Sequence, residues 1–217
     1  MRIPYLFLGI FLFAFAIPCF SQGKKYLKNP SFEDTPKMGH PPKGWFDCGQ
    51  PDESPVDVHG VGYKFESEYF EVVEKAAEGY TFLGMVIRDN GTYEGVSAKL
   101  LQPLLKDAAY KLTIMVNQSL NYQSISRTTD EPLNYDQPVL FEIWGGYAYC
   151  KMTTLIAEYE VKESGNWTEL TFHFTPGEDI KFIGLYARHT TEIYDNGNVL
   201  LDDLQIVKVD AVTLEER

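Results

Sequence analysis

Apolar and polar residues alternate along most of the chain beyond residue 80. In the segment 110–119, every second position from Tyr110 to Val116 is apolar, and most of the positions between them are polar. A repeat of two residues is typical of a β-strand with one buried face. Similar short runs, separated by Gly, Pro, Asn and Asp, predict strands at 26–32, 81–88, 94–101, 110–119, 138–144, 151–161, 167–175, 181–188 and 198–209, and a strand or helical turn at 65–73.

No segment has a convincing amphipathic helical pattern, and turn residues punctuate the strands. These features predict an all-β fold, an antiparallel β-sandwich. Residues 120–137 are polar and predict a long loop, as does most of the Pro- and Gly-rich stretch before residue 62. Because no repeat, linker or change of composition divides residues 22–217, we expect a single domain there.

The first 21 residues have a different pattern. Arg2 is followed by an apolar run from Ile3 to Ile17, and the small residues Cys19 and Ser21 precede Gln22. This pattern predicts a cleavable signal peptide at 1–21, because secretory signals have a positively charged start, an apolar centre and small residues before the cleavage site. A permanent anchor is the alternative, as is a lipoprotein with Cys19 as the lipidated residue. No other stretch is apolar enough to span a membrane, so we expect a secreted, periplasmic or outer-surface protein.

The net charge and the aromatic content of the chain indicate which kinds of molecule the protein binds. The net charge of −12 would repel phosphate backbones, so nucleic acid is not an expected partner. Aromatic residues make up 14% of the chain, more than a core requires. Surplus Tyr and Trp often face ligands such as sugars, although they are also favoured in strands.

Two cysteines, Cys48 and Cys150, lie beyond the predicted signal peptide. An exported protein folds in an oxidising compartment, where these residues can form a disulfide. Two buried free thiols are the alternative. Neither cysteine lies in a cluster with metal-ligand spacing.

The strand 138–144 supplies the strongest candidate for ligand binding. Alternation places Val139, Phe141 and Ile143 on one face of the strand, and Glu142 and Trp144 on the other. If the first face is core, the second presents an aromatic ring and a carboxylate to solvent. Tyr147 and Tyr149 follow closely. A flat aromatic ring can stack on a pyranose, while carboxylates bind its hydroxyls. The alternative is that Trp144 is the buried tryptophan of the sandwich.

Arg88 and Glu94 flank the Asn90-Gly91 turn, so a hairpin can set them opposite each other. They form either an ion pair or a second set of groups that binds sugar hydroxyls. Catalysis has weaker support, because nothing in the sequence selects two carboxylates as a glycosidase pair and no nucleophile or phosphate-binding motif is present.

Several short motifs occur in a characteristic order along the chain, although each is a weak signal on its own. They are Asn29 to Asp34, Gly44-Trp45, Tyr80 to Gly84, Glu94 to Ser97, Leu101 to Leu104, Trp167 to Phe172 with Phe174 to Pro176, and Leu200 to Ile206. The series resembles the galactose-binding-like jelly-roll superfamily, particularly carbohydrate-binding modules. It is also similar to exported jelly-roll domains of Bacteroidetes-type bacteria, which occur alone or ahead of OmpA-like domains. The sequence departs from the module pattern at Pro30, where the modules have Gly, and in its longer loops at 35–70 and 120–137.

The resemblance implies a structural calcium ion where the opening segment meets the last strand. Its matching carboxylates are Glu33, Asp202 and Asp203. Calcium prefers oxygen ligands, and carboxylates with backbone carbonyls can supply six or more. A hydrogen-bonded acidic cluster without an ion is the alternative.

These observations predict an exported, non-catalytic module that binds a glycan, a polysaccharide or a cell-envelope component. A structural or adhesion protein of the bacterial surface that recognises protein partners is the alternative. A glycoside hydrolase or lyase is a third class. The fold alone does not choose among them, because this architecture supports many functions.

Overall fold

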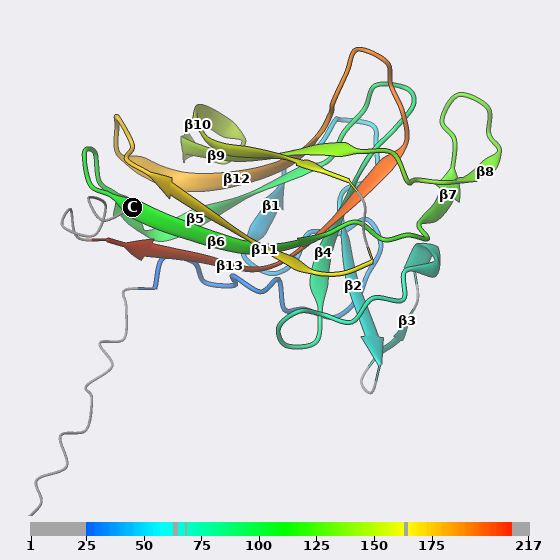
Figure 1. Ribbon diagram of the computed structural model, residues 1–217, viewed down its shortest axis with the longest axis horizontal. Coiled ribbons are helices and arrows are strands. Elements are labelled where there is room, and N and C mark those ends of the chain that lie inside the picture. Colours follow the sequence, from blue (N-terminus) through cyan, green and yellow to red (C-terminus); the bar gives the residue numbers. More distant parts are fainter. Residues whose placement is uncertain (1–24, 63–64, 68, 163–164, 210–217) are drawn as a thin grey trace, which may run out of the picture.

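The structure is a computed structural model that describes residues 25–62, 65–67, 69–162 and 165–209. The predicted signal peptide at 1–21, including Cys19, lies outside these residues. Figure 1 shows two layers of strands, one above the other, with the small β7–β8 hairpin at one end. All the strand pairs are antiparallel. The predicted fold class, an antiparallel β-sandwich of jelly-roll type, is confirmed.

One layer is a five-stranded sheet and the other is a six-stranded sheet. The five-stranded sheet has the order β1 (Trp45–Asp47), β5 (Gly95–Leu104), β12 (Ile180–His189), β9 (Val139–Ala148) and β10 (Lys151–Val161). The six-stranded sheet has the order β11 (Thr168–Phe174), β6 (Tyr110–Asn117), β13 (Gly197–Lys208), β4 (Phe82–Ile87), β2 (Asp57–Gly62) and β3 (Phe65–Ser67). The short helical turn η1 (Tyr69–Glu71) follows β3, while β7 (Gln123–Ile125) and β8 (Pro132–Asn134) pair with each other.

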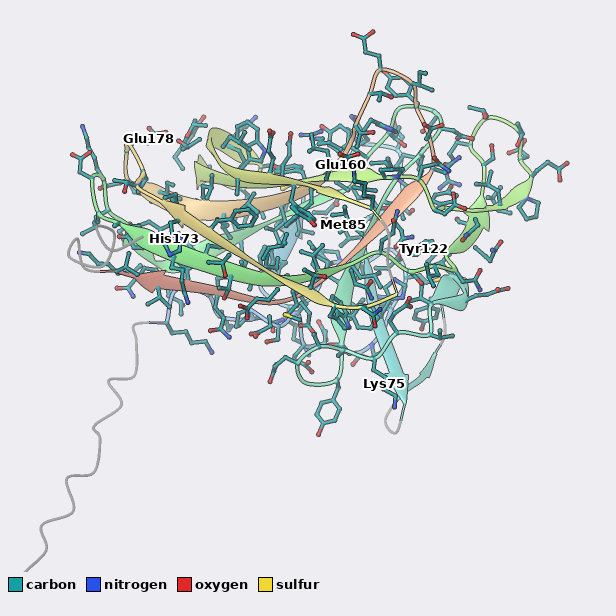
Figure 2. All side chains as sticks on the ribbon, in the orientation of Figure 1. Lys75, Met85, Tyr122, Glu160, His173 and Glu178 are labelled. Atoms are coloured by element: carbon teal, nitrogen blue, oxygen red, sulfur yellow. A yellow bond between two sulfur atoms is a disulfide. The ribbon has the colours of Figure 1, made fainter. Side chains whose placement is uncertain are left out.

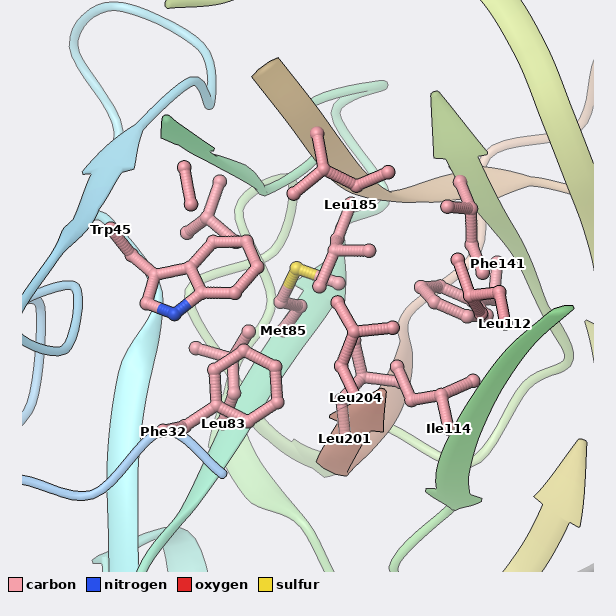
Figure 3. Close-up of a cluster of buried hydrophobic side chains, with 14 of the residues drawn as sticks. Phe32, Trp45, Leu83, Met85, Leu112, Ile114, Phe141, Leu185, Leu201 and Leu204 are labelled. Atoms are coloured by element: carbon pink, nitrogen blue, oxygen red, sulfur yellow. The ribbon is translucent and has the colours of Figure 1, made fainter. Parts of the chain in front are cut away.

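The core lies between the two sheets, where alternate residues of each strand meet. Figure 3 shows Met85 of β4 and Leu201 of β13 facing Phe141 of β9 and Leu185 of β12. Trp45 belongs to this core: its ring lies 5.0 Å from that of Phe32. Trp45, rather than Trp144, is therefore the buried tryptophan of the sandwich.

A second, smaller apolar cluster lies on the outer face of the six-stranded sheet. Phe82 and Val86 of β4 point away from the main core, as does Leu200 of β13, and loop residues cover them. Tyr122 and Tyr135 supply part of the cover from the segment that holds β7 and β8. Figure 2 shows Tyr122 near the start of β7, towards the end of the sandwich. The outer face of the six-stranded sheet is thus closed to large ligands at these positions.

The predicted strand at 26–32 is wrong. The side chain of Asn29 accepts a hydrogen bond from the Glu33 amide at 3.0 Å and donates one to the Glu33 carbonyl at 3.1 Å. These bonds close a turn, and Phe32 has a φ of 52°, which a strand does not allow. Tyr26 and Phe32 are nevertheless buried, so the segment packs along the core without joining a sheet.

Other strands differ from the prediction in number and length. The short strands β1 and β2 lie in the stretch predicted as loops, and β7 and β8 lie in the polar loop 120–137. β9 continues through Gly145 and Gly146 to Ala148, so Tyr147 belongs to the strand rather than to a loop.

None of the helices in the described part of the chain is long and apolar enough to cross a membrane.

Candidate functional site

The outer face of the five-stranded sheet carries the predicted aromatic site. On β9, Phe141 and Ile143 are fully buried, whereas Glu142 and Trp144 are half-buried on the opposite face, as the alternation predicted. The neighbouring strand β12 places Gly184 opposite Trp144 and Tyr186 opposite Glu142. Two adjacent strands therefore present their outward side chains side by side.

An open groove lies on this face, with a volume of about 260 Å³. It is lined by Cys48, Tyr93, Trp144, Cys150, Met152, Tyr186 and Arg188. The predicted Trp144 is one of these residues. Tyr93, Met152, Tyr186 and Arg188 were not singled out in the sequence, although the alternation of β12 carries a signal for two of them: Tyr186 and Arg188 alternate with the core residues Leu185 and Ala187.

Glu142 holds the two principal groups of the groove in place. Its Oε2 atom accepts a hydrogen bond from the Trp144 indole nitrogen at 2.8 Å and lies 3.4 Å from Nε of Arg188. Glu142 itself does not line the groove. The predicted carboxylate thus supports Trp144 and Arg188 and does not itself form part of the groove wall.

The guanidinium of Arg188 lies over two tyrosine rings. Its guanidinium carbon is 3.6 Å from the centre of the Tyr93 ring and 4.8 Å from that of Tyr186. A cation over an aromatic face is attracted by the ring quadrupole, and planar guanidinium groups stack well. Tyr186 in turn fits closely over Gly95, where an added Cβ would lie 2.3 Å from the ring. A residue larger than glycine at position 95 would therefore displace Tyr186 from the groove.

The predicted disulfide between Cys48 and Cys150 is present, with a Cα–Cα distance of 5.4 Å. Cys48 follows β1, and its amide donates to the carbonyl of Gly95 at 2.8 Å. Cys150 occupies the turn between β9 and β10 and has a φ of 56°. The disulfide therefore links this turn to the segment after β1, the strand at the other edge of the sheet. It also forms part of the groove wall.

An aromatic platform, formed by Phe46, Tyr149 and Phe182, lies beside the groove. The ring of Tyr149 is 5.1 Å from that of Phe46 and 4.8 Å from that of Phe182. Phe46 and Tyr149 are both exposed. The predicted Tyr147 is 61% exposed and neither lines the groove nor joins the platform.

The predicted pair Arg88 and Glu94 lies elsewhere, inside the protein. The two side chains form an ion pair and are 3% and 1% exposed, respectively. Arg88 also donates to Ser54 Oγ at 3.1 Å, and Glu94 accepts a hydrogen bond from the Val86 amide at 3.0 Å. Of the two alternatives, the structure has the ion pair, and neither residue lines the groove.

Two buried carboxyl groups share the surroundings of Arg88. Asp57 accepts hydrogen bonds from Tyr122 Oη at 2.9 Å and from the Gly39 amide at 2.7 Å. Burial raises the pKa of Glu94 from 4.5 to about 8, with Arg88 opposing the shift and Asp57 adding to it. Burial likewise raises the pKa of Asp57 from 3.8 to about 6. One guanidinium thus faces two carboxyl groups that resist ionisation.

Two of the three carboxylates predicted to bind calcium support a loop in this structure, and the third, Asp203, bonds within β13. Glu33 accepts hydrogen bonds from the amides of Tyr80 and Thr81 at 2.8 and 3.2 Å. Asp202 accepts one from the Glu78 amide at 2.9 Å, while Asp203 accepts two from Gln205. In the described residues, no three His, Cys, Asp or Glu side chains are grouped so as to hold a metal ion. Calcium binding stays a prediction.

Comparison with known proteins supports the fold. No family model matches the chain, and no curated protein matches it. A Stig cyclase from Fischerella sp. TAU is 16% identical, with a TM-score of 0.53, and the match covers 86% of this chain and 98% of that one. The K2 cleaved adhesin domain of Lys-gingipain is 13% identical, with a TM-score of 0.52, and the match covers 82% and 96%.

A xylan-binding domain from Paenibacillus barcinonensis is 18% identical, with a TM-score of 0.44, and the match covers 83% of this chain and 92% of that one. At such identities, structural similarity shows the fold and not the activity. The chain therefore has the predicted β-sandwich fold, which is similar to the folds of the Stig cyclase and of the adhesin domain.

We expect the disulfide to contribute strongly to stability, because it closes a loop with a sequence separation of 102 residues. Loop-closure entropy predicts a loss of about 4.7 kcal/mol when Cys48 and Cys150 are both changed to serine. Urea unfolding of the oxidised protein and the double variant measures this loss. Adding dithiothreitol should destabilise the wild type and leave the variant unchanged; equal midpoints for the oxidised wild type and the variant would contradict the expectation.

The buried carboxyl groups should make the protein less stable as pH rises from 6.5 to 8. Glu94 has a pKa of about 8 when folded and 4.5 ordinarily, so the folded state binds more protons in this window and the free energy of unfolding falls. One such group changes the free energy of unfolding by up to about 1.4 kcal/mol per pH unit. The buried His59, whose pKa is lowered to about 3 from an ordinary value of 6.5, acts in the opposite direction at and below pH 6.5, and its effect fades as the pH rises towards 8.

Urea unfolding at pH 6.5, 7.2 and 8 measures this slope. Glu94→Gln cannot ionise, so we expect a shallower slope in this variant, whatever its absolute stability. Glu178→Gln is the matched control, because the Glu178 side chain is exposed on the surface. An unchanged slope in Glu94→Gln would show that Glu94 does not hold the extra proton.

Proposed function

We propose that this protein is a non-catalytic module that binds a glycan in the groove on the five-stranded sheet. The observation that carries the proposal is the Trp144–Glu142–Arg188 unit, in which one carboxylate fixes an indole and a guanidinium beside an open groove. Aromatic rings can stack on the apolar faces of sugars, and the guanidinium can bind their oxygen atoms.

The chemistry of the groove supports binding rather than turnover. Glycosidases usually use two carboxyl groups about 5–9.5 Å apart. None of the seven residues that line the groove is a carboxylic acid. The nearby Glu142 is already engaged by Trp144 and Arg188, which leaves it poorly suited to act as a general acid.

We also propose that the protein is exported through the signal peptide at 1–21, with ordinary cleavage rather than lipidation at Cys19. The Cys48–Cys150 disulfide supports this location, because disulfides persist in oxidising compartments. A polysaccharide or another cell-envelope component would then be within reach. Mass determination of the mature protein distinguishes a start at Gln22 from a lipidated Cys19.

Trp144→Ala should abolish most of the glycan binding. Truncating a central aromatic contact commonly costs about 2 kcal/mol or more, which is a loss of roughly 30-fold in affinity. A glycan array followed by calorimetry on the positive glycans measures the effect. Tyr194→Ala is the matched control, because Tyr194 is an exposed aromatic residue that does not line the groove.

A silent array with folded wild-type protein would contradict the proposal. Specific capture of a cell-envelope protein, lost on Phe46→Ala in the aromatic platform, would then favour the adhesion alternative. Cleavage of any polysaccharide in a reducing-end assay would instead favour a hydrolase or lyase.

We further propose that calcium binds where Glu33 and Asp202 meet the loop 77–81. Both carboxylates hold backbone amides of this loop, so an ion here would need carbonyl oxygens and water as additional ligands. Calcium at 100 times its dissociation constant should add about 2.7 kcal/mol to the free energy of unfolding. Urea unfolding in calcium and in EDTA measures this gain. Equal stabilities would remove the calcium proposal, and magnesium is the control ion.

A further inference from the structure

Arg188 has a set of hydrogen-bond donors that the described part of the protein does not use. Its Nε atom lies 3.4 Å from Glu142 Oε2, and its guanidinium carbon lies over the Tyr93 ring. The two terminal nitrogens, Nη1 and Nη2, make no hydrogen bond or ion pair with the described residues. The side chain is 30% exposed and lines the groove, so this pair of nitrogens is accessible to a ligand.

The position of Glu142 decides which edge of the guanidinium is free. A guanidinium has a fork of two parallel donors between Nη1 and Nη2, which matches the two oxygens of a carboxylate. Glu142 takes the Nε side and shares the same oxygen with Trp144, so it leaves this fork unoccupied. The contact with Tyr93 and the bond to Glu142 hold the guanidinium in place in advance, which reduces the entropy lost on binding.

The charges around the groove limit how many negative groups a ligand can carry. Arg188 is the one basic residue among those that line the groove. Glu158 lies opposite Glu142 in the β9–β10 ladder, and the chain as a whole carries a net charge of −12. A polyanion would be repelled by this field, whereas a single carboxylate could bind Arg188 at short range.

We propose that the Arg188 fork makes the groove selective for a uronic acid residue carried on an otherwise neutral glycan. This inference rests on the proposed glycan-binding function and names its ligand class. Stacking on Trp144 would hold the sugar ring, and its carboxylate would accept two hydrogen bonds from Nη1 and Nη2 of Arg188.

Calorimetry with small glycosides tests the inference. The probes are the methyl glycosides of glucuronic and galacturonic acid, their neutral methyl esters, and the methyl glycosides of glucose and galactose. Hydrogen bonds to charged groups contribute about 1.5–3 kcal/mol, so one acid should bind roughly 10- to 100-fold more tightly than its ester. Arg188→Gln should remove this preference, so that the acid and its ester bind with similar affinity, and it should weaken the binding of the neutral glycosides less than that of the acid.

Two further variants make the test specific. Arg188→Lys keeps the charge without the fork, and it should lose most of the preference for the acid. Arg127→Gln removes an equal charge away from the groove, where Arg127 pairs with Glu53 at 3.0 Å, and should behave as wild type. Circular dichroism and thermal unfolding confirm that each variant is folded.

The outcomes separate this inference from the proposed function. Equal binding of acid and ester by the wild type would overturn the inference and leave glycan binding intact. An equal loss of acid and neutral sugars in Arg188→Gln would also overturn it, because Arg188 would then only position the groove. Tighter binding of polygalacturonate per residue than of the single uronide would overturn the restriction to isolated acids. No binding in either series or on the glycan array would overturn both proposals.

Discussion

A β-sandwich buries the inner faces of its sheets against each other. Whether loops cover the two outer faces or leave them open therefore determines where a ligand can bind. The outer face of the six-stranded sheet carries Phe82, Val86 and Leu200, which would be costly to leave in water. Loops with Val72, Tyr122 and Tyr135 cover them and form a second apolar cluster. On the five-stranded sheet the groove stays open, and the rings and the guanidinium beside it tolerate water at their polar ends.

The groove and the buried charges depend on the same segments of chain. Tyr93 lies under Arg188 in the groove, whereas the next residue, Glu94, points inward to Arg88. The loop after β1 connects the same two regions, because it carries Cys48 at the groove and Ser54 against Arg88. The ion pair therefore fixes the backbone that positions one wall of the groove. This arrangement gives a buried ion pair a positional role even where its net contribution to stability is small.

The fold class and the central part of the candidate site could be predicted from the sequence, because both follow from the alternation of residues within single strands. Alternation within β9 sent Phe141 inward and Trp144 outward, and no tertiary information was needed to see it. Arg188 was within reach of the same argument, since it alternates with buried residues of β12. The same argument could not identify Tyr93. This residue lies outside the named strands and faces the groove only through the packing of Arg188. The turn at Asn29 and the burial of Arg88 and Glu94 also depend on contacts that spacing does not encode.

The hydrogen bonds of Glu142 hold two groups of the groove in place before any ligand is present. A half-buried indole needs an acceptor for its N–H, and a partly buried guanidinium needs a negative partner. One carboxylate oxygen meets both requirements, so Trp144 and Arg188 share a single support. Immobilising a flexible side chain on binding costs about 0.5–1.5 kcal/mol, and here that cost is met during folding. Sugars offer many weak contacts in a fixed geometry, and a surface ordered in advance is what allows such contacts to add up to useful affinity.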